Sequence, residues 1–536
     1  MNLQTSDMQG LIVRGYKTLP AATNILLRIT DAPAAAKYFN FLADTYITTG
    51  EKPNKHDKRL NNDPDKAVNI AFTRSGIAQL LNEDILKTFS REFIEGMSFS
   101  QGAYNKRDHY TSMSADEKGL AEVLDSADSE ERSIMLGDRG KNHPNNWHWG
   151  NEHNPVDVLL MVYAGNKTAL EELIADIFCN HQQGVEVVYV AGTYEYNPNN
   201  LREHFGFTDG ISQPIIKGLG KEAEDKRTLV NAGEFILGYT NEYNSFSPSP
   251  FVDNNAASAA LKEYTADTTK KDLGNNGTYL VFRQIEQHVE TFWDYLYANS
   301  KEAAASKTEQ AVLLGAKMVG RWPDGRSLVQ APTAGCPVTD TTLNDFMYAD
   351  TDKEGLMCPF GSHVRRTNPR DQVHSSRDKK DSLELSNKHR MLRRGRIYGE
   401  PLDKDFNIDN MIHRHGVTTP APVKSCIGNE NENAVRGIHF ICLVSDIARQ
   451  FEFVQNVWAN TSTFGGLCNE VDPIISPRPT AEQPDCHEFT TPHEIVRNRY
   501  KNIPEFTTVV GGAYFFMPGM SALKYIVTYS MANEAS

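Results

Sequence analysis

The stretch at residues 156–163 limits the possible fold more than any other part of the chain. It runs Val-Asp-Val-Leu-Leu-Met-Val-Tyr, which is a nearly continuous apolar segment. A short apolar run of this kind is typical of a strand that is covered on both faces, so it predicts a strand at the centre of a sheet. An amphipathic helix over residues 168–181 and a second strand over residues 185–190 are expected to follow it.

The segments upstream complete a repeating order of elements. We expect a strand at residues 24–30, a helix at 34–45, a strand at 67–72 and a short helix that Ser75 begins as its N-cap. The order is then strand, helix, strand, strand, helix, strand, which is the ferredoxin-like arrangement.

The second half repeats this order without repeating the sequence. Strands are expected at residues 278–285, 437–444 and 506–517, the last of them split by Gly511-Gly512. The predicted fold class is therefore α+β, with two ferredoxin-like domains built on antiparallel sheets. We place the N-terminal domain at residues 1–215 and the C-terminal domain at residues 216–536.

Charge and composition exclude some classes of partner and location. The chain has 536 residues, a net charge of −14 and a sequence pI of about 5.6, which argues against nucleic acid or an anionic membrane as a partner. No apolar run is long enough to span a membrane, and no signal peptide is visible at the start. The seven cysteines form no Cys-x-x-Cys pair, which favours a reducing compartment, so a cytoplasmic protein is expected.

A single histidine lies in a loop that is dense in arginine. His363 follows a Pro/Gly turn, and Arg365, Arg366 and Arg370 come within seven residues of it. Arginine pairs in a bidentate manner with carboxylates, so this loop could hold a metal-centred cofactor that carries carboxylate arms. The alternatives are a structural histidine and a solvated basic patch.

An acidic residue flanked by glycines is the second candidate. Gly206 and Gly210 lie on either side of Asp209 and allow tight backbone geometry there. Phe205, Phe207 and Ile211 would surround the carboxyl group with apolar atoms and so raise its pKa. The alternative is an ordinary Asp-Gly turn.

Two other groups of residues have competing interpretations. Arg393, in the run Arg390–Gly395, is either a functional cation or part of a solvated helix end. His143, His148 and His153 alternate with tryptophans, but their spacing suits no metal-ligand face, so we interpret this segment as a surface loop.

Three of these stretches together resemble motifs of the dye-decolorizing peroxidases, haem proteins of the chlorite-dismutase-like superfamily. They are Gly206-Phe-Thr-Asp-Gly210, the run Cys358–Arg370 and the run Arg390–Gly395, and they occur in the family's order. Weaker similarity at residues 7–10, 233–239, 436–440, 451–455 and 511–516 extends the resemblance over nearly the whole chain.

The resemblance implies one haem b per chain, held in the C-terminal domain. It makes His363 the axial ligand of the haem iron, Asp209 the catalytic acid–base and Arg393 the catalytic arginine. The positions that it places against the cofactor are Gly210, Ile211, Ser212, Asn368, Pro369, Arg370, Arg393, Ile438 and Phe440. Ile438 stands where the family has leucine, which changes the shape of the peroxide pocket slightly.

The resemblance also implies the reaction. A haem-dependent peroxidase would use hydrogen peroxide to oxidise dyes, phenols and other aromatic donors through an oxoferryl intermediate, with an acidic pH optimum because its base is a carboxylate. Bulky donors would be oxidised at the surface through Tyr or Trp, while Trp293 and Trp458 are expected in the core. Members of the family often form dimers or larger assemblies, so a homo-oligomer is expected.

The second N–H of His363 should be donated to a carboxylate, for which Asp472 is the first candidate and Glu452 the second. Two competing functions remain at this point. One is a haem-binding or haem-handling protein with incidental peroxidase activity, and the other is a ferredoxin-like module without a cofactor.

Overall fold

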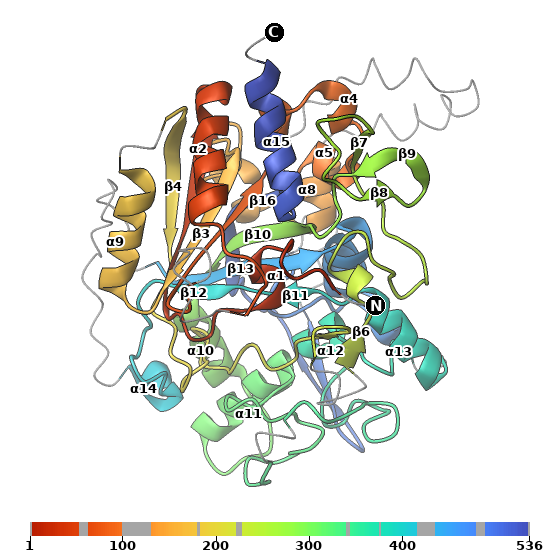
Figure 1. The fold of residues 1–536 in the computed structure, drawn as a ribbon. Coiled ribbons are helices and arrows are strands. Elements are labelled where there is room, and N and C mark those ends of the chain that lie inside the picture. The colour runs from red at the N-terminus through yellow and green to blue at the C-terminus, as the bar shows by residue number, and fades with distance from the viewer. Residues whose placement is uncertain are drawn as a thin grey trace.

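The computed structural model describes residues 3–52, 63–98, 130–179, 183–220, 228–338, 343–374, 377–414, 435–478 and 488–533. Its centre is one large antiparallel sheet with helices on both sides (Figure 1). Among these residues, no helix is both long enough and apolar enough to cross a membrane.

The N-terminal half of the sheet has the predicted order of elements. The chain forms β1 (Ala21–Ile29), α2 (Ala32–Thr45), β2 (Lys66–Phe72), β3 (Val158–Ala164), α9 (Lys167–Phe178) and β4 (Val185–Gly192). In space the strands lie in the order β4-β1-β3-β2, and all neighbours are antiparallel. The predicted central strand β3 is buried along its whole length, between β1 and β2.

The C-terminal half repeats that arrangement. Its elements are β10 (Thr278–Gln287), α10 (Val289–Asn299), α11 (Lys307–Val319), β11 (Leu392–Arg393), β12 (Arg396–Tyr398), β13 (Gly437–Val444), two π-helical turns (Ala448–Glu452 and Val454–Asn460) and β16 (Thr507–Met517). Strands β11 and β12 pair with β13, β13 pairs with β10, and β10 pairs with β16. The ferredoxin-like order is thus present twice.

The two half-sheets join edge to edge. Phe516 of β16 is the register partner of Phe72 of β2, so a single sheet runs through the molecule. Helices α2 and α15 (Met520–Asn533) lie side by side over one face, and α10, α11 and α14 (Ile408–His413) gather on the other side of the molecule (Figure 1). The division into domains at residue 215 stays a prediction.

Three local expectations were wrong. Gly511 and Gly512 do not split the last strand, because β16 runs through them; a Cβ on Gly511 would lie 2.5 Å from the indole nitrogen of Trp149, which packs there. Helix α3 (Arg74–Leu80) is capped by Thr73, not by Ser75. Helix α15 was not expected at all, and the Asp7 carboxylate caps it by accepting from the Ser521 N–H at 2.8 Å.

The polar region at residues 99–155 was expected to be a long loop, and residues 99–129 of it lie outside the described residues. The remainder contains α8 (Glu130–Leu136) and two short 3-10 turns at Gly140–Asn142 and Pro144–Asn146. Trp147 and Trp149 are buried here, so this part packs against the sheet and is not the surface loop that was expected.

The remaining elements are short. They are α1 (Gly10–Val13), α4 (Glu83–Leu86), α5 (Arg91–Glu95), β5 (Ile215–Ile216), β6 (Leu229–Val230), a 3-10 turn (Ala232–Glu234), β7 (Phe251–Asp253), β8 (Glu263–Tyr264), β9 (Asp267–Asp272), α12 (His363–Thr367), α13 (Lys379–Lys388), a 3-10 turn (Phe464–Gly466), β14 (Phe489–Pro492) and β15 (Arg497–Tyr500).

Candidate active site

The Asp209 loop is a tight hairpin that links the two halves of the fold. The Asp209 N–H donates to the Leu201 carbonyl at 2.8 Å, which closes the hairpin. Phe205 stacks on Phe292 with the ring centroids 4.4 Å apart, and Phe207 stacks on Trp293 at 6.2 Å. The two phenylalanines therefore anchor the loop in the core beneath α10, where Trp293 is buried as predicted, and they do not surround the Asp209 carboxylate.

Glycine is needed on both sides of this acid. Gly206 has a φ of 93° and Gly210 a φ of 77°, both in the left-handed region that favours glycine. A Cβ on Gly206 would also lie 2.9 Å from the Met411 methyl group, whereas a Cβ on Gly210 would meet no atom within 4 Å. The backbone at Gly210 therefore borders open space next to Asp209.

Arg393 holds the Asp209 carboxylate. Its NH1 donates to Asp209 Oδ1 at 2.8 Å, and its own backbone N–H donates to Gln213 Oε1 at 3.1 Å. Burial by itself would raise the pKa of Asp209, but the Arg393 guanidinium outweighs it and the pKa lies below its ordinary value of 3.8. The expectation that apolar neighbours raise this pKa was therefore wrong. The alternative of a solvated helix end does not hold for Arg393, since it lies in strand β11.

His363 begins helix α12 and pairs with a buried carboxylate. Its Nδ1 donates to Asp472 Oδ2 at 2.9 Å, and Asp472 is fully buried. Asp472 Oδ1 accepts from the N–H groups of Ile474 and Ile475, which fixes the carboxylate. Burial would lower the pKa of His363, but Asp472 raises it above its ordinary value. Glu452, the second candidate partner, instead accepts from the Tyr514 hydroxyl and from Arg132.

The pair of Asp209 and Arg393 interacts electrostatically with the pair of His363 and Asp472, and hydrogen bonds connect their loops. The charge of His363 lowers the pKa of Asp209, and the charge of Arg393 lowers that of His363. The Asn368 amide donates to Ser212 Oγ at 3.2 Å and so ties the His363 loop to the Asp209 loop. Arg390 donates to the Asn368 side chain at 3.3 Å and to the Ser212 carbonyl at 3.4 Å.

The arginines next to His363 have structural roles. Arg365 is fully buried, donates to Asp352 Oδ2 at 2.9 Å and lies 4.2 Å from the ring centroids of both Tyr348 and Phe360. Arg366 donates to backbone carbonyls, including that of Trp458 at 2.8 Å. Arg370 is buried 3.8 Å from the Phe346 ring centroid. All three side chains contact other residues of the protein. They therefore form neither a solvated basic patch nor a group of arginines available to the carboxylates of a cofactor.

The substitution Arg365→Met should therefore destabilise the fold strongly. It would leave the buried Asp352 carboxylate without its cation, a change that typically costs about 3–5 kcal/mol of unfolding free energy. Urea denaturation would measure the loss. Lys379→Met is the control, because Lys379 forms an exposed pair with Asp350 and should change stability by less than about 1 kcal/mol. Equal effects of the two substitutions would contradict the structural role of Arg365.

A pocket of about 700 Å³ opens next to Asp209. Its lining includes Tyr196, Asp209, Gly210, Arg393 and Ile438. Of the other predicted cofactor contacts, Ile211, Ser212 and Asn368 are half-buried beside the pocket-lining loop, and Pro369 is buried within the His363 loop. Phe440 is half-buried near Phe451 and does not line this pocket.

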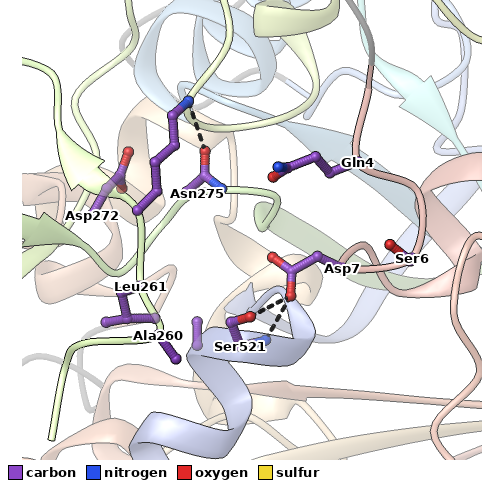
Figure 2. A pocket seen from close by; sticks show the side chains of 10 residues that line it. Gln4, Ser6, Asp7, Ala260, Leu261, Asp272, Asn275 and Ser521 are labelled. Carbon is purple, nitrogen blue, oxygen red and sulfur yellow. Dashed lines mark hydrogen bonds between the residues drawn. The ribbon is translucent and has the colours of Figure 1, made fainter.

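A second pocket, of about 530 Å³, lies where the N-terminal segment meets the start of α15 (Figure 2). Its polar groups bind one another: Asp7 accepts from Ser521, and Lys262 donates to Asn275 Oδ1 at 3.4 Å. Neither histidine nor cysteine lines it, so it offers no acid–base pair or soft ligand comparable with those at Asp209 and His363.

Three residues near the site were not singled out from the sequence. Gln213 and Glu203 lie four and six residues from Asp209, so proximity along the chain was the signal that could have found them. Arg390 belongs to the same run as Arg393.

The chain is similar in sequence to known dye peroxidases. No family model matches the chain. A multifunctional dye peroxidase of Amycolatopsis sp. is 32% identical over 329 residues, which are 60% of this chain and 60% of the relative. A dye-decolorizing peroxidase of Auricularia auricula-judae is 28% identical over 378 residues, 68% of this chain and 64% of the relative. The matched part thus spans less than two thirds of either relative.

The fold extends the similarity over the whole chain. A crystal structure of a fungal DyP-type peroxidase from Auricularia auricula-judae superposes with a TM-score of 0.68 and 22% identity, covering 98% of this chain and all of the other. At this low sequence identity the superposition shows only that the fold is shared. The similarity in sequence comes from the relatives named above. Together they show that the chain is similar in sequence to dye-decolorizing peroxidases and has the fold of a DyP-type peroxidase.

Proposed function

We propose that this protein is a haem peroxidase that uses hydrogen peroxide to oxidise dyes, phenols and other aromatic donors. The observation that carries the proposal is the arrangement of two pairs, His363 with Asp472 and Asp209 with Arg393, on loops joined by the contact between Asn368 and Ser212. The names of the relatives support the same activity.

The residues present fit a haem. Asp472 occupies Nδ1 of His363, and the Nε2 atom makes no hydrogen bond to any described residue although the side chain is 29% exposed. An imidazole held in this way by a carboxylate could bind the iron of a haem. Among the described residues no three His, Cys, Asp or Glu side chains gather as they would around a free metal ion. A lone histidine therefore suits an iron whose other ligands come from a porphyrin, and we propose haem b, one per chain.

Each side chain has a defined task in the proposed reaction. Bound haem would supply the iron that binds peroxide and takes up its oxidising equivalents. The Asp209 carboxylate takes the proton from one peroxide oxygen and returns it to the other; Arg393 occupies its Oδ1, which leaves Oδ2 for the proton. The Arg393 guanidinium stabilises the negative charge that develops as the O–O bond breaks. Asp472 fixes the tautomer of His363 and makes Nε2 a stronger electron donor.

Loading the purified protein with haem tests the proposal. We expect a Soret band that changes completely with one equivalent of hydrogen peroxide and recovers with two equivalents of a one-electron donor such as a phenol. A haem-handling protein with incidental activity would need a large excess of peroxide. A protein that takes up no haem, or that holds haem without reacting with peroxide, would contradict the proposal.

The pH dependence follows from the pair of Asp209 and Arg393. Since Arg393 lowers the pKa of Asp209 below 3.8, the carboxylate stays ionised into the acidic range and is protonated only below that value. The acid limb of kcat/KM for peroxide should therefore lie below about pH 4. Arg393→Met removes the largest cause that lowers the pKa of Asp209, while the Gly210 N–H and His363 remain, so the limb should move to higher pH.

The profile is measured as initial rates of donor oxidation between pH 2.5 and 8. Arg28→Met serves as the control, because Arg28 forms a half-exposed pair with Glu186 on the edge of the sheet and should leave the limb in place. An optimum at alkaline pH, or an acid limb at the same pH in Arg393→Met, would show that Asp209 is not the titrating base.

A further inference from the structure

A second carboxylate shares the pocket with Asp209. Glu203 lies on the same hairpin and lines the same cavity. Its Oε1 accepts from the Phe207 N–H at 2.9 Å, and its Oε2 accepts from the Phe205 N–H at 2.9 Å and from the Gln287 amide at 2.5 Å. Oε1 thus has one donor and a free lone pair, while Oε2 has two donors.

The two carboxyl groups have different protonation states. Burial raises the pKa of Glu203 to about 7, although the three N–H donors oppose this, and the nearby charge of Asp209 raises it further. Asp209 stays ionised because it has Arg393 as its partner. Below neutral pH Glu203 is therefore protonated while Asp209 is ionised, which is how environments divide acid and base roles between two similar residues.

The proposed reaction needs such a proton supply. Each turnover converts one hydrogen peroxide, two electrons and two protons into two water molecules. The donors release the electrons and the protons, but a donor oxidised away from the pocket releases its protons there. Protons must then return to the peroxide oxygens through the pocket, and Asp209, with its lowered pKa, is a poor store for them.

We propose that Glu203 is the second proton carrier of this pocket, taking protons from pocket water through Oε1 and passing them towards Asp209. The inference rests on the proposed function and deepens it. Glu203 acts through Asp209 and does not touch peroxide. The hydrogen bonds of its two oxygens hold the carboxyl group in one orientation, with Oε1 able to carry the proton.

Other charged groups also face the pocket and shape this equilibrium. Besides Asp209 they are Lys17, Glu195, Arg202, Arg393, Arg394, Arg396 and Lys404, while His204, next in sequence, is buried and neutral because burial lowers its pKa to about 3. Gln287 of β10, which packs directly against the carboxyl group, is uncharged.

Glu203→Gln separates proton transfer from structure, because glutamine has the shape of the protonated acid but carries no exchangeable acidic proton. Infrared difference spectra of the haem-loaded protein should show a protonated carboxyl band that disappears with a midpoint near pH 7 in the wild type and is absent in Glu203→Gln. In the same variant we expect kcat for donor oxidation at pH 5 to fall at least about tenfold, and the decline of kcat through pH 7 to be lost.

Glu302→Gln is the matched control. Glu302 is buried, accepts from the Tyr500 hydroxyl at 2.7 Å, and lies outside the pocket. Thermal unfolding of both variants compares their structural cost, and only Glu203→Gln should change the pH profile.

Two results would overturn the proposal that Glu203 carries protons. One is a carboxyl band that Glu203→Gln does not remove, and the other is a variant whose kcat and whose decline through pH 7 match the wild type. Glu203 would then be a structural cap of the hairpin. If Asp209→Asn still lost turnover in that case, the peroxidase proposal would stand without the relay. A wild-type protein that takes up haem but never turns over peroxide would remove both.

Discussion

Replacing His363 by alanine should abolish stable haem binding. Among the described residues of the site, the imidazole is the side chain with a nitrogen available to iron, and the carboxylate that orients it is buried and fixed by two backbone N–H groups. We expect the affinity for haem to fall by at least about 100-fold, since even loss of an outer partner such as Asp472 typically costs about 10–100-fold at a metal site. Titration with haem, followed at the Soret band, measures both effects.

The controls separate ligand loss from misfolding. His143→Ala changes a histidine of the segment before β3 whose Nδ1 accepts from the Asn145 N–H in its own turn, and it should keep wild-type affinity. Asp472→Asn should retain haem but bind it more weakly than the wild type. Adding imidazole to His363→Ala offers a replacement ligand, and recovery of the Soret band would show that the cavity is intact. Wild-type affinity in His363→Ala would mean that another residue holds the iron.

Replacing Asp209 by asparagine has the second large expected effect, this time on catalysis. Asparagine keeps the size of the side chain and can still bind Arg393 through its carbonyl oxygen, but it cannot accept a proton. Loss of a general acid–base group costs about 10²–10⁴-fold, and we expect kcat/KM for hydrogen peroxide to fall within that range. Stopped-flow mixing with peroxide gives the rate constant directly.

Haem affinity should not change in Asp209→Asn, because the carboxylate is paired with Arg393 and not with His363. Asp44→Asn, which alters an exposed ion pair with Lys524 on the helical face, should react at the wild-type rate. If Asp209→Asn reacted with peroxide as fast as the wild type, the acid–base role would belong to another group, and the argument for Glu203 would fall with it.

The order of secondary-structure elements could be predicted from the sequence because it depends on local patterns. The apolar run of β3 and the helical spacing after it require no knowledge of distant residues. The prediction failed at β16, where two adjacent glycines indicated a break. Gly511 is a glycine because Trp149, more than 300 residues earlier in the chain, packs its indole against the strand, and a Cβ on Gly512 would lie 2.7 Å from the sulfur of Met97. These contacts leave no trace in the local pattern.

Charge states at the site were harder to predict for the same reason. Phe205 and Phe207 suggested an apolar environment for Asp209, but both rings turn into the core beneath α10. The residue that decides the pKa is Arg393, 184 positions away. Likewise, the sequence near His363 could not show that Arg365 is bound to Asp352. Asp352 lies thirteen residues upstream, and the sequence does not tell whether the chain folds back far enough for the two side chains to meet. The motifs placed His363, Asp209 and Arg393 in one region, while their pairing required the fold.

The contact between the first segment of the chain and its last helix affects how the protein is made. Asp7 caps α15, and the Gln9 side chain donates to the Ile70 and Pro518 carbonyls, so early and late residues complete the same structure. Ribosomes release a chain from its N-terminal end, so α2 leaves the ribosome several hundred residues before α15, the helix that packs on it. The apolar face of α2 is therefore the surface on which a nascent chain of this protein most needs protection by a chaperone.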